Sequence, residues 1–294
     1  MIITHNMQIE GHELVALSFN PDAFGTPIIL IHGITASVGT WIADGESLFA
    51  QYGPVYALSL PGHYPAVLPS DFQQDDLTAE MIARVLTAAI RELIGEQTAV
   101  LVGHSTGAFA VLAIAAHAPE ITHSVICIAG FAQGRWIGPL GIAQRVVPHG
   151  AIGKIVFKAA YLSNRRPRWW FKASLRIYAA DPSVIFAFPF IDAIIDNSRP
   201  YYKHLDLDAM AHYFIVMPDI DIETWLPRIS APTLILVGDS DPIVPSAQSD
   251  LIAAHVPHAQ LNVLKGVGHV PMFERYDDYT RMMDEWLREP SNIG

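Results

Sequence analysis

The chain has 294 residues, of which 51% are hydrophobic and 16% charged, a balance that favours a globular core and excludes a disordered chain. Its net charge of -11 argues against nucleic acid as a partner. No basic start precedes an apolar run, and no apolar stretch reaches the about 18 residues that span a bilayer, so neither a signal peptide nor membrane insertion is expected.

A lone cysteine, Cys127, allows no internal disulfide. No zinc-type Cys/His cluster, P-loop or dinucleotide fingerprint is present. We therefore expect a cytoplasmic protein that needs no metal or cofactor.

Strands and helices alternate along the first half of the chain. The expected elements are two short strands within 7–19, a strand over 28–32, a helix over 38–50, a strand over 54–60, a helix over 77–94, a strand over 98–102, a helix over 108–117 and a strand over 124–129. This alternation predicts a parallel sheet with helices on both faces.

The rhythm breaks between residues 131 and 228, where helical fragments rich in aromatic residues replace strands. This segment has 12 Lys and Arg against 8 Asp and Glu, whereas the rest of the chain has 6 against 21. We interpret 131–228 as a helical lid inserted into a core formed by 1–130 and 229–294. Its basic, aromatic stretch 165–178 fits an amphipathic helix, which either rests on a lipid surface or packs over an apolar pocket. The scattered aromatics favour packing. Strands over 233–237 and 260–264 and helices over 246–255 and 276–288 then complete the core.

A sharp turn between a strand and a helix carries the most informative motif. The apolar run Ala99–Val102 ends in Gly103-His104-Ser105-Thr106-Gly107, and the helical run Ala108–His117 follows at once. Glycines two positions either side of Ser105 let the backbone turn tightly without a clash. The helix begins directly behind the serine, so its free N–H groups and dipole face any oxyanion formed there. The motif predicts a nucleophilic serine raised on a turn.

Groups able to complete a serine site follow the ends of other predicted strands. Ile34, Ser105, Asp241 and His269 all lie just past such ends, and in a parallel sheet the carboxyl ends of the strands share one edge. A serine needs a base to take its proton, and a histidine needs a carboxylate on its other nitrogen. Asp241 is the natural carboxylate, because the order serine, acid, histidine is the one expected for this kind of site.

Together these motifs resemble the α/β-hydrolase superfamily, in its lid-bearing branch of esterases, lactonases and C–C bond hydrolases. The resemblance covers the chain outside 131–228 through four turns, which are H-G at 32–33, G-H-S-T-G at 103–107, G-x-x-D at 238–241 and G-H-x-P at 268–271. It implies an α/β-hydrolase fold, with a mostly parallel central sheet flanked by helices and an inserted helical lid. It also implies Ser105 as nucleophile, His269 as base and Asp241 as acid. The backbone N–H groups of Ile34 and Thr106 would form the oxyanion hole.

Two positions near the site depart from the simplest pattern. Asp239 competes with Asp241, although the family spacing of three residues after Gly238 favours Asp241. Relatives often carry a G-x-G-type turn where this chain reads Pro-Gly-His-Tyr-Pro at 61–65. Flanking side chains expected near the substrate are His32, His104, Trp136 and His212. For His32 and His104 a structural role competes with this one, because His32 opens the oxyanion turn and His104 packs beneath the elbow.

The expected activity is hydrolysis of a carboxylic ester or lactone of an uncharged, hydrophobic small molecule through an acyl-enzyme on Ser105. A C–C bond hydrolase or a perhydrolase with the same triad, or a binding protein on the same fold, remain alternatives. A small molecule is the expected partner, and the sequence leaves open whether the protein is a monomer or a dimer.

Overall fold

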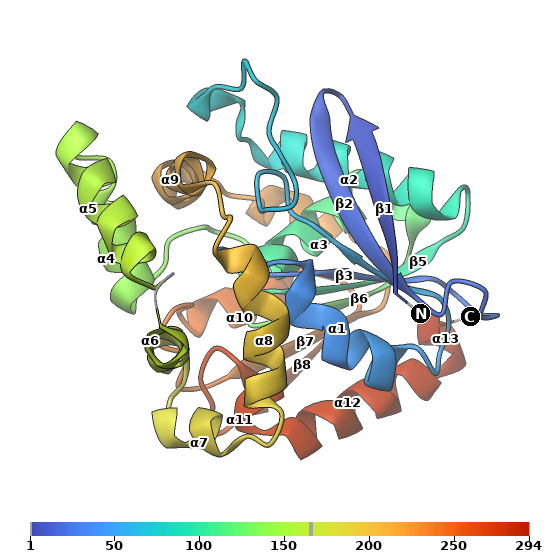
Figure 1. Cartoon of the computed structure of the whole chain (residues 1–294). Coiled ribbons are helices and arrows are strands. Elements are labelled where there is room, and N and C mark those ends of the chain that lie inside the picture. Colours follow the sequence, from blue (N-terminus) through green and yellow to red (C-terminus); the bar gives the residue numbers. More distant parts are fainter. Residues whose placement is uncertain (1, 165–166, 294) are drawn as a thin grey trace.

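The computed structural model of the chain describes residues 2–164 and 167–293. Within these residues an eight-stranded sheet runs in the order β1-β2-β4-β3-β5-β6-β7-β8 (Figure 1). The strands are β1 Ile3–Ile9, β2 His12–Phe19, β3 Ile28–Ile31, β4 Val55–Leu58, β5 Ala99–His104, β6 Thr122–Ile128, β7 Thr233–Gly238 and β8 Ala259–Leu264. The alternating strands and helices of the sequence therefore form one mixed sheet.

Pairing within the sheet divides it into a hairpin edge and a parallel centre. β1 and β2 are antiparallel, and β2 is antiparallel to β4, whereas every pair from β4 across to β8 is parallel. Glu10 and Gly11 join β1 to β2 with φ of 51° and 81°, the two positive values that a tight hairpin turn requires. The central strands β3 and β4 are buried at every position because both faces of the sheet are covered by helices.

The helices divide into those that cover the sheet and those of an insert. The former are α1 Ile42–Asp44, α2 Ala79–Ile94, α3 Thr106–His117, α10 Ala247–His255, α11 Pro271–Glu274, α12 Tyr276–Arg288 and α13 Pro290–Ile293. The latter, between β6 and β7, are α4 Gly138–Val146, α5 Gly150–Asn164, α6 Arg168–Ser174, α7 Pro182–Ala187, α8 Ile191–Tyr202 and α9 Leu207–Val216. We call residues 131–228 the insert. In its described part a single isolated bridge, Gln133 with Asp221, is the sole β pairing.

α3 is the central helix of the core. It packs against α2, β3, β5 and β6, and its residues from Thr106 to Ala116 are all buried. A helix that is apolar on every side needs cover on every side, which the sheet and α2 supply. This burial fixes the helix that begins directly behind Ser105.

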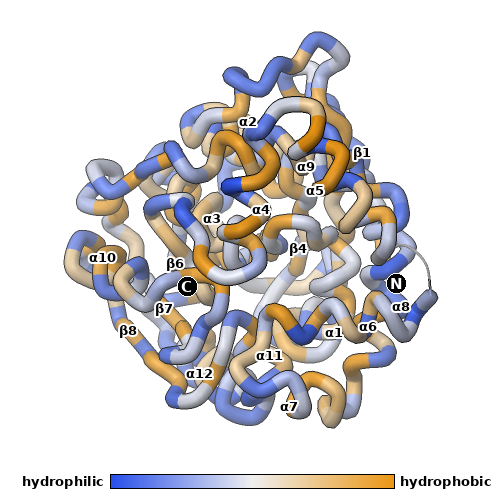
Figure 2. Tube along the Cα trace, turned by 90° about the vertical axis from the view of Figure 1, so that its left-hand side faces the viewer, coloured by the Kyte–Doolittle hydropathy of each residue, from blue (hydrophilic) through white to orange (hydrophobic). Residues whose placement is uncertain are grey.

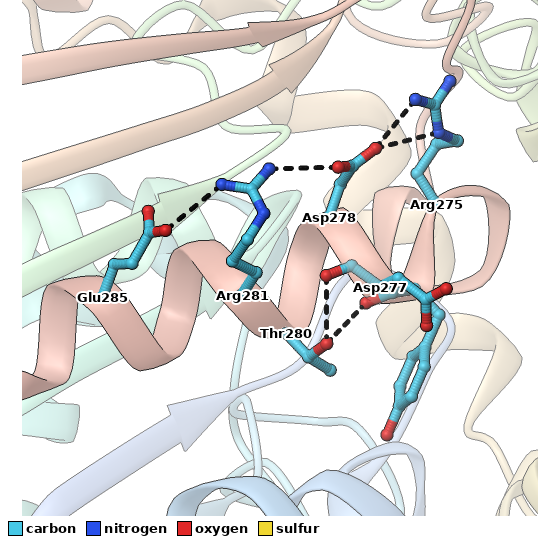
Figure 3. A network of polar contacts seen from close by, with 7 residues as sticks. Arg275, Asp277, Asp278, Thr280, Arg281 and Glu285 are labelled. Atoms are coloured by element: carbon cyan, nitrogen blue, oxygen red, sulfur yellow. Dashed lines mark hydrogen bonds and ion pairs between the residues drawn. The ribbon is translucent and has the colours of Figure 1, made fainter.

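α12 shows the opposite, amphipathic pattern. Tyr279 and Met283 are fully buried beneath it, while its outer face carries a chain of ion pairs (Figure 3). Asp278 pairs with both Arg275 and Arg281, and Arg281 also pairs with Glu285. Exposed pairs of this kind contribute little stability each, so the buried face holds α12 in place.

The segment 38–50, expected to form one helix, is instead broken into three turns. A 3₁₀ turn, Val38–Trp41, leads into α1 and then into a π-helical turn, Gly45–Phe49. The ring of Phe19 lies so close to Gly45 that an added Cβ would meet it at 2.8 Å. The glycine therefore lets the backbone rest on this ring, and regular α geometry gives way to that contact.

The insert rests on the carboxyl ends of the parallel strands. An added Cβ on Gly39 would lie 2.5 Å from the carbonyl oxygen of Asn197, so α8 crosses the 3₁₀ turn at close range. None of the helices within the described ranges is both long and apolar enough to cross a bilayer.

Candidate active site

Ser105 stands on a strained turn between β5 and α3. Its φ of 57° and ψ of -117° lie outside the regions that non-glycine residues ordinarily adopt. The neighbouring glycines make this turn possible. An added Cβ on Gly103 would lie 2.2 Å from the carbonyl oxygen of Gly107, and one on Gly107 would lie 2.1 Å from that of Ile31. The structure thus gives the predicted elbow a steric reason, and such strain is typical of functional positions.

The peptide between Gly33 and Ile34 is oriented by His32. Leu60 N–H donates to Nε2 of His32 at 3.2 Å, so the ring proton lies on Nδ1, which donates to the carbonyl oxygen of Gly33 at 2.9 Å. Ala36 N–H donates to the same oxygen. In a trans peptide the N–H points opposite to the C=O, so fixing the Gly33 carbonyl also fixes the direction of the Ile34 N–H. Burial lowers the pKa of His32 to about 4, which keeps the ring neutral.

The two predicted oxyanion donors both lie close to Ser105. An added Cβ on Gly33 would be 3.1 Å from Cβ of Ser105, which brings the turn at 33–34 against the serine. Thr106 is the first residue of α3, where backbone N–H groups lack a helical acceptor. Neither Ile34 N–H nor Thr106 N–H donates to another group among the residues described. Both donors are therefore available to a ligand.

His269 and Asp241 form a buried pair. Nδ1 of His269 lies 2.7 Å from Oδ2 of Asp241, and the two side chains are 1% and 5% exposed. The other oxygen of Asp241 accepts the N–H groups of Ile243 and Val244, which hold the carboxylate in position. The geometry leaves Nε2 of His269 to act on the cavity side.

Asp239 does not take this place. Its Oδ1 accepts the N–H of Gly266 and the hydroxyl of Ser240 at the exposed end of the loop after β7. Of the two carboxylates, Asp241 is the one that contacts His269.

The backbone of His269 is held from both sides. Its N–H donates to the carbonyl oxygen of Tyr178 at 2.7 Å, and its carbonyl oxygen lies 2.8 Å from Nε2 of His104. Because a carbonyl can only accept, His104 donates from Nε2. Burial and the neighbouring His269 lower the pKa of His104 to about 3, so this ring is neutral. His104 therefore anchors the predicted base and does not compete with it for a proton.

Glu274 links the loop of His269 to the insert, a contact that no sequence motif indicated. Its Oε1 accepts the N–H of Gly268 at 3.0 Å, and its Oε2 accepts that of Ala180 at 2.9 Å. One carboxylate thus joins the residue before the predicted base to the end of the 3₁₀ turn at 175–178. The insert and the core therefore meet at the loop that carries His269.

A cavity of about 410 Å³ joins these groups, a size that suits a small organic ligand. Ser105, His269, His32, His104 and Ile34 lie in its wall on the core side. The insert supplies a mostly apolar wall that includes Leu140, Val147, Phe157, Phe171, Ile177, Phe188, Ile194 and Ile195. Among the described lining residues none is Lys or Arg, and Asp44 is the sole carboxylate besides the histidine-bound Asp241 nearby. The cavity therefore suits an apolar, uncharged molecule.

Two of the side chains expected at the substrate do not line this cavity. Trp136 packs edge-on between Phe131 and Phe214, and His212 lies edge-on against Phe72. Both belong to the packing of the insert on the core. His32 and His104 do line the cavity, although each ring is committed to a backbone carbonyl.

Known proteins share this arrangement of strands and helices. A model of the alpha/beta hydrolase family matches residues 28–281. The chain belongs to the alpha/beta hydrolase family. The candidate site lies where three features of this chain meet. These are the order of the strands in the sheet, the turn at Ser105 and the insert between β6 and β7.

Relatives of this alpha/beta hydrolase include enzymes with several named activities. A provisionally named carbamate hydrolase, RutD, of Stutzerimonas stutzeri is 26% identical over 92% of this chain and 93% of its own length. A 2-hydroxy-6-oxo-6-phenylhexa-2,4-dienoate hydrolase of Burkholderia cepacia is 25% identical over 92% and 91%. The enol-lactonase of Burkholderia xenovorans LB400 superposes with a TM-score of 0.76 over 97% of this chain and 100% of its own, at 18% identity. The last likeness is one of fold.

Proposed function

We propose that this protein is a serine hydrolase that cleaves a carboxylic ester or lactone of an uncharged, hydrophobic small molecule. The observation that carries the proposal is the convergence of Ser105 and the His269–Asp241 pair on one apolar cavity. A serine held at φ 57° and a histidine with a buried carboxylate partner are features typical of catalytic sites, so they favour an enzyme over a protein that only binds.

The chemistry follows from the groups in place. His269 Nε2 takes the hydroxyl proton as Ser105 Oγ attacks the substrate carbonyl. The oxyanion that forms accepts hydrogen bonds from the backbone N–H groups of Ile34 and Thr106. The tetrahedral intermediate collapses to an acyl-enzyme, and the leaving alcohol receives the proton from His269. Water then gives a proton to His269 as it attacks the acyl group, and Ser105 regains its proton as the acid departs.

The cavity supports an uncharged substrate over an anionic one. The dienoate named for the Burkholderia cepacia relative is a carboxylate, and a buried carboxylate needs a cation or several donors. No Lys or Arg lines the cavity within the described residues, whereas apolar side chains from the insert form most of its wall. We therefore place an ester or lactone ahead of an anionic C–C substrate. The insert would then act as the lid that excludes water.

The test is hydrolysis of nitrophenyl esters of graded acyl length by the wild type and by Ser105→Ala. Wild-type turnover with an optimum at an intermediate chain length, lost by at least about 10⁴-fold in the variant, is expected. Ser70→Ala removes an exposed serine and serves as the matched control. Retained hydrolysis in Ser105→Ala overturns the proposal. If no ester is turned over, labelling of Ser105 by a serine-directed phosphonate separates a competent site awaiting a C–C or peracid substrate from a binding protein.

A further inference from the structure

The insert carries an apolar surface that nothing in the described chain covers. Its members are large side chains that are all exposed, namely Ile142, Ile152, Ile155, Val156, Leu162, Trp169 and Trp170. We call these seven residues the outer face. Ile152, Ile155 and Trp169 are 76%, 64% and 65% exposed. A cluster of this kind on one side of a protein marks an interaction site.

The outer face spans three neighbouring helices. α5 contacts both α4 and α6, and the three lie together on the side of the molecule that faces the viewer in Figure 2. Ile152, Ile155 and Leu162 recur at helical spacing along α5, while Phe157 and Tyr161 pack inward against Phe214. α5 is therefore apolar on two opposite sides, and its inner side alone meets the protein. The aromatics expected to pack over the pocket divide in the same way, because Phe171 lines the cavity whereas Trp169 and Trp170 face outward.

The chain segment that carries the outer face is basic. Residues 121–180 contain nine Lys and Arg and no Asp or Glu, in a chain whose net charge is -11. Lys158, Arg168 and Lys172 pair with aspartates of α8 and α9. Lys154 on α5 and Arg145 on α4 have no carboxylate partner among the described residues. The apolar side chains of α4 and α5 therefore have two cations beside them, Lys154 and Arg145, whose charge no described carboxylate neutralises.

The lining of the cavity reaches this face. Ile142 and Val156 are 55% and 53% exposed and also line the cavity wall. A molecule that touches Ile142 and Val156 on the outer face is therefore next to the wall of the space that Ser105 lines. This continuity connects the surface to the proposed reaction.

These observations select among possible partners. Nucleic acid would match the cations but leaves the aliphatic residues of α5 unexplained. A second copy joined by the same face would set like charges opposite one another, because a two-fold interface pairs each patch with itself. An anionic phospholipid surface accounts for both the apolar side chains and the cations. Ile, Leu and Trp enter the boundary between headgroups and acyl chains, while Lys and Arg reach the headgroups.

We propose that the outer face docks the protein on anionic phospholipid membranes, so that an apolar substrate dissolved in the lipid enters the cavity from the bilayer. Docking is peripheral. Membrane docking is inferred from the outer face alone. The entry of substrate from the bilayer rests in addition on the proposed function.

The first test is co-sedimentation of the full chain with vesicles of phosphatidylcholine and of phosphatidylcholine with about a third phosphatidylglycerol. We use Ser105→Ala as the background, so that vesicle lipids are not consumed. Binding to the anionic vesicles is expected, together with a loss of at least about tenfold in affinity for Ile155→Ser/Trp169→Ser. Phe24→Ser is the matched control, because Phe24 is fully exposed in the β2–β3 connection, outside the insert. Arg145→Gln is expected to weaken binding at low salt, and Lys265→Gln, an exposed cation after β8, is not.

Two results overturn docking. One is equal binding by the wild type and Ile155→Ser/Trp169→Ser, or no binding by either. The other is a stable dimer in analytical ultracentrifugation that the double variant dissociates, which would give the outer face to a second copy. Hydrolysis of a short, water-soluble ester separates the two proposals. The double variant is expected to retain it fully and to lose activity on a long-chain ester presented in vesicles. Vesicle binding without any ester hydrolysis would refute the proposed function and leave docking intact.

Discussion

His104, the residue before the predicted nucleophile, donates a hydrogen bond from Nε2 to the backbone carbonyl of His269, the predicted base, at 2.8 Å. Their rings lie with centroids 5.0 Å apart. The elbow after β5 and the loop after β8 are far apart in sequence, and this bond fixes one against the other. The relative position of Ser105 and His269 therefore depends on a neighbouring histidine that takes no part in proton transfer.

The first prediction tests this anchor. His104→Ala removes the donor to His269 and lets the loop shift, so kcat for ester hydrolysis is expected to fall about 10- to 100-fold with little change in KM. His104→Gln, whose amide can reach the same carbonyl, is expected to recover most of the loss. His258→Ala, on an exposed histidine, is the control. Equal activity of His104→Ala and the wild type would show that the anchor does not position the base.

The second prediction compares two neighbouring aspartates. Asp241→Asn leaves the acceptors for Ile243 and Val244 in place but cannot hold the tautomer of His269, so a loss of about 10⁴-fold in kcat is expected. Asp239→Asn keeps an oxygen for the N–H of Gly266 and is expected to stay within a few-fold of the wild type. Steady-state kinetics of the two purified variants decide the matter, and a larger loss in Asp239→Asn would reverse the assignment.

The sequence predicted those parts of the site that local backbone geometry determines. The turn at Ser105 needs glycines at fixed offsets, and the groups after β3, β5, β7 and β8 share one edge because parallel strands end together. Every strand expected in the core is present, with ends that differ from the expected ones by four residues at most. These features depend on short-range sterics and on one rule of topology.

The parts that were not predicted depend on how the insert packs. Trp136 was expected at the substrate, yet it packs edge-on between two phenylalanines, because the direction of a side chain in the loop before α4 follows its tertiary neighbours. Glu274 gave no signal, since its partners are backbone N–H groups that any sequence carries. The exposure of Trp169 likewise follows from which side of α6 meets the cavity.

The third prediction concerns the strain at the elbow. Ser105→Gly and Ser105→Ala both remove the hydroxyl, but only glycine adopts φ 57° and ψ -117° without a Cβ penalty. Relief of about 1–3 kcal/mol, offset by about 0.5–1 kcal/mol of additional chain entropy, leaves Ser105→Gly about 1 kcal/mol more stable than Ser105→Ala. Urea denaturation of both inactive variants measures the difference. A less stable glycine variant would mean that the turn stores no strain.

The last prediction follows from Asp44, which lines the cavity at the end of α1. Its Oδ2 accepts a hydrogen bond from the hydroxyl of Tyr279 at 3.2 Å. Burial raises the pKa of Asp44 from 3.8 to about 6, because the charged carboxylate is poorly solvated there. A folded-state pKa above the unfolded one means that the protonated form supports the fold. That contribution is complete below pH 3.8 and is lost as the pH rises through about 6.

Asp44→Asn cannot ionise and keeps an oxygen for Tyr279, so it is expected to be more stable than the wild type above pH 7 and no more stable at pH 4. The expected gain in free energy of unfolding is about 1–3 kcal/mol, since part of the charge is screened at the cavity edge. Urea denaturation at pH 4 and pH 8 checks it, with Glu46→Gln, an exposed acid two residues on, as the control. A difference between wild type and Asp44→Asn that does not change with pH would show that Asp44 ionises as freely as in the unfolded chain.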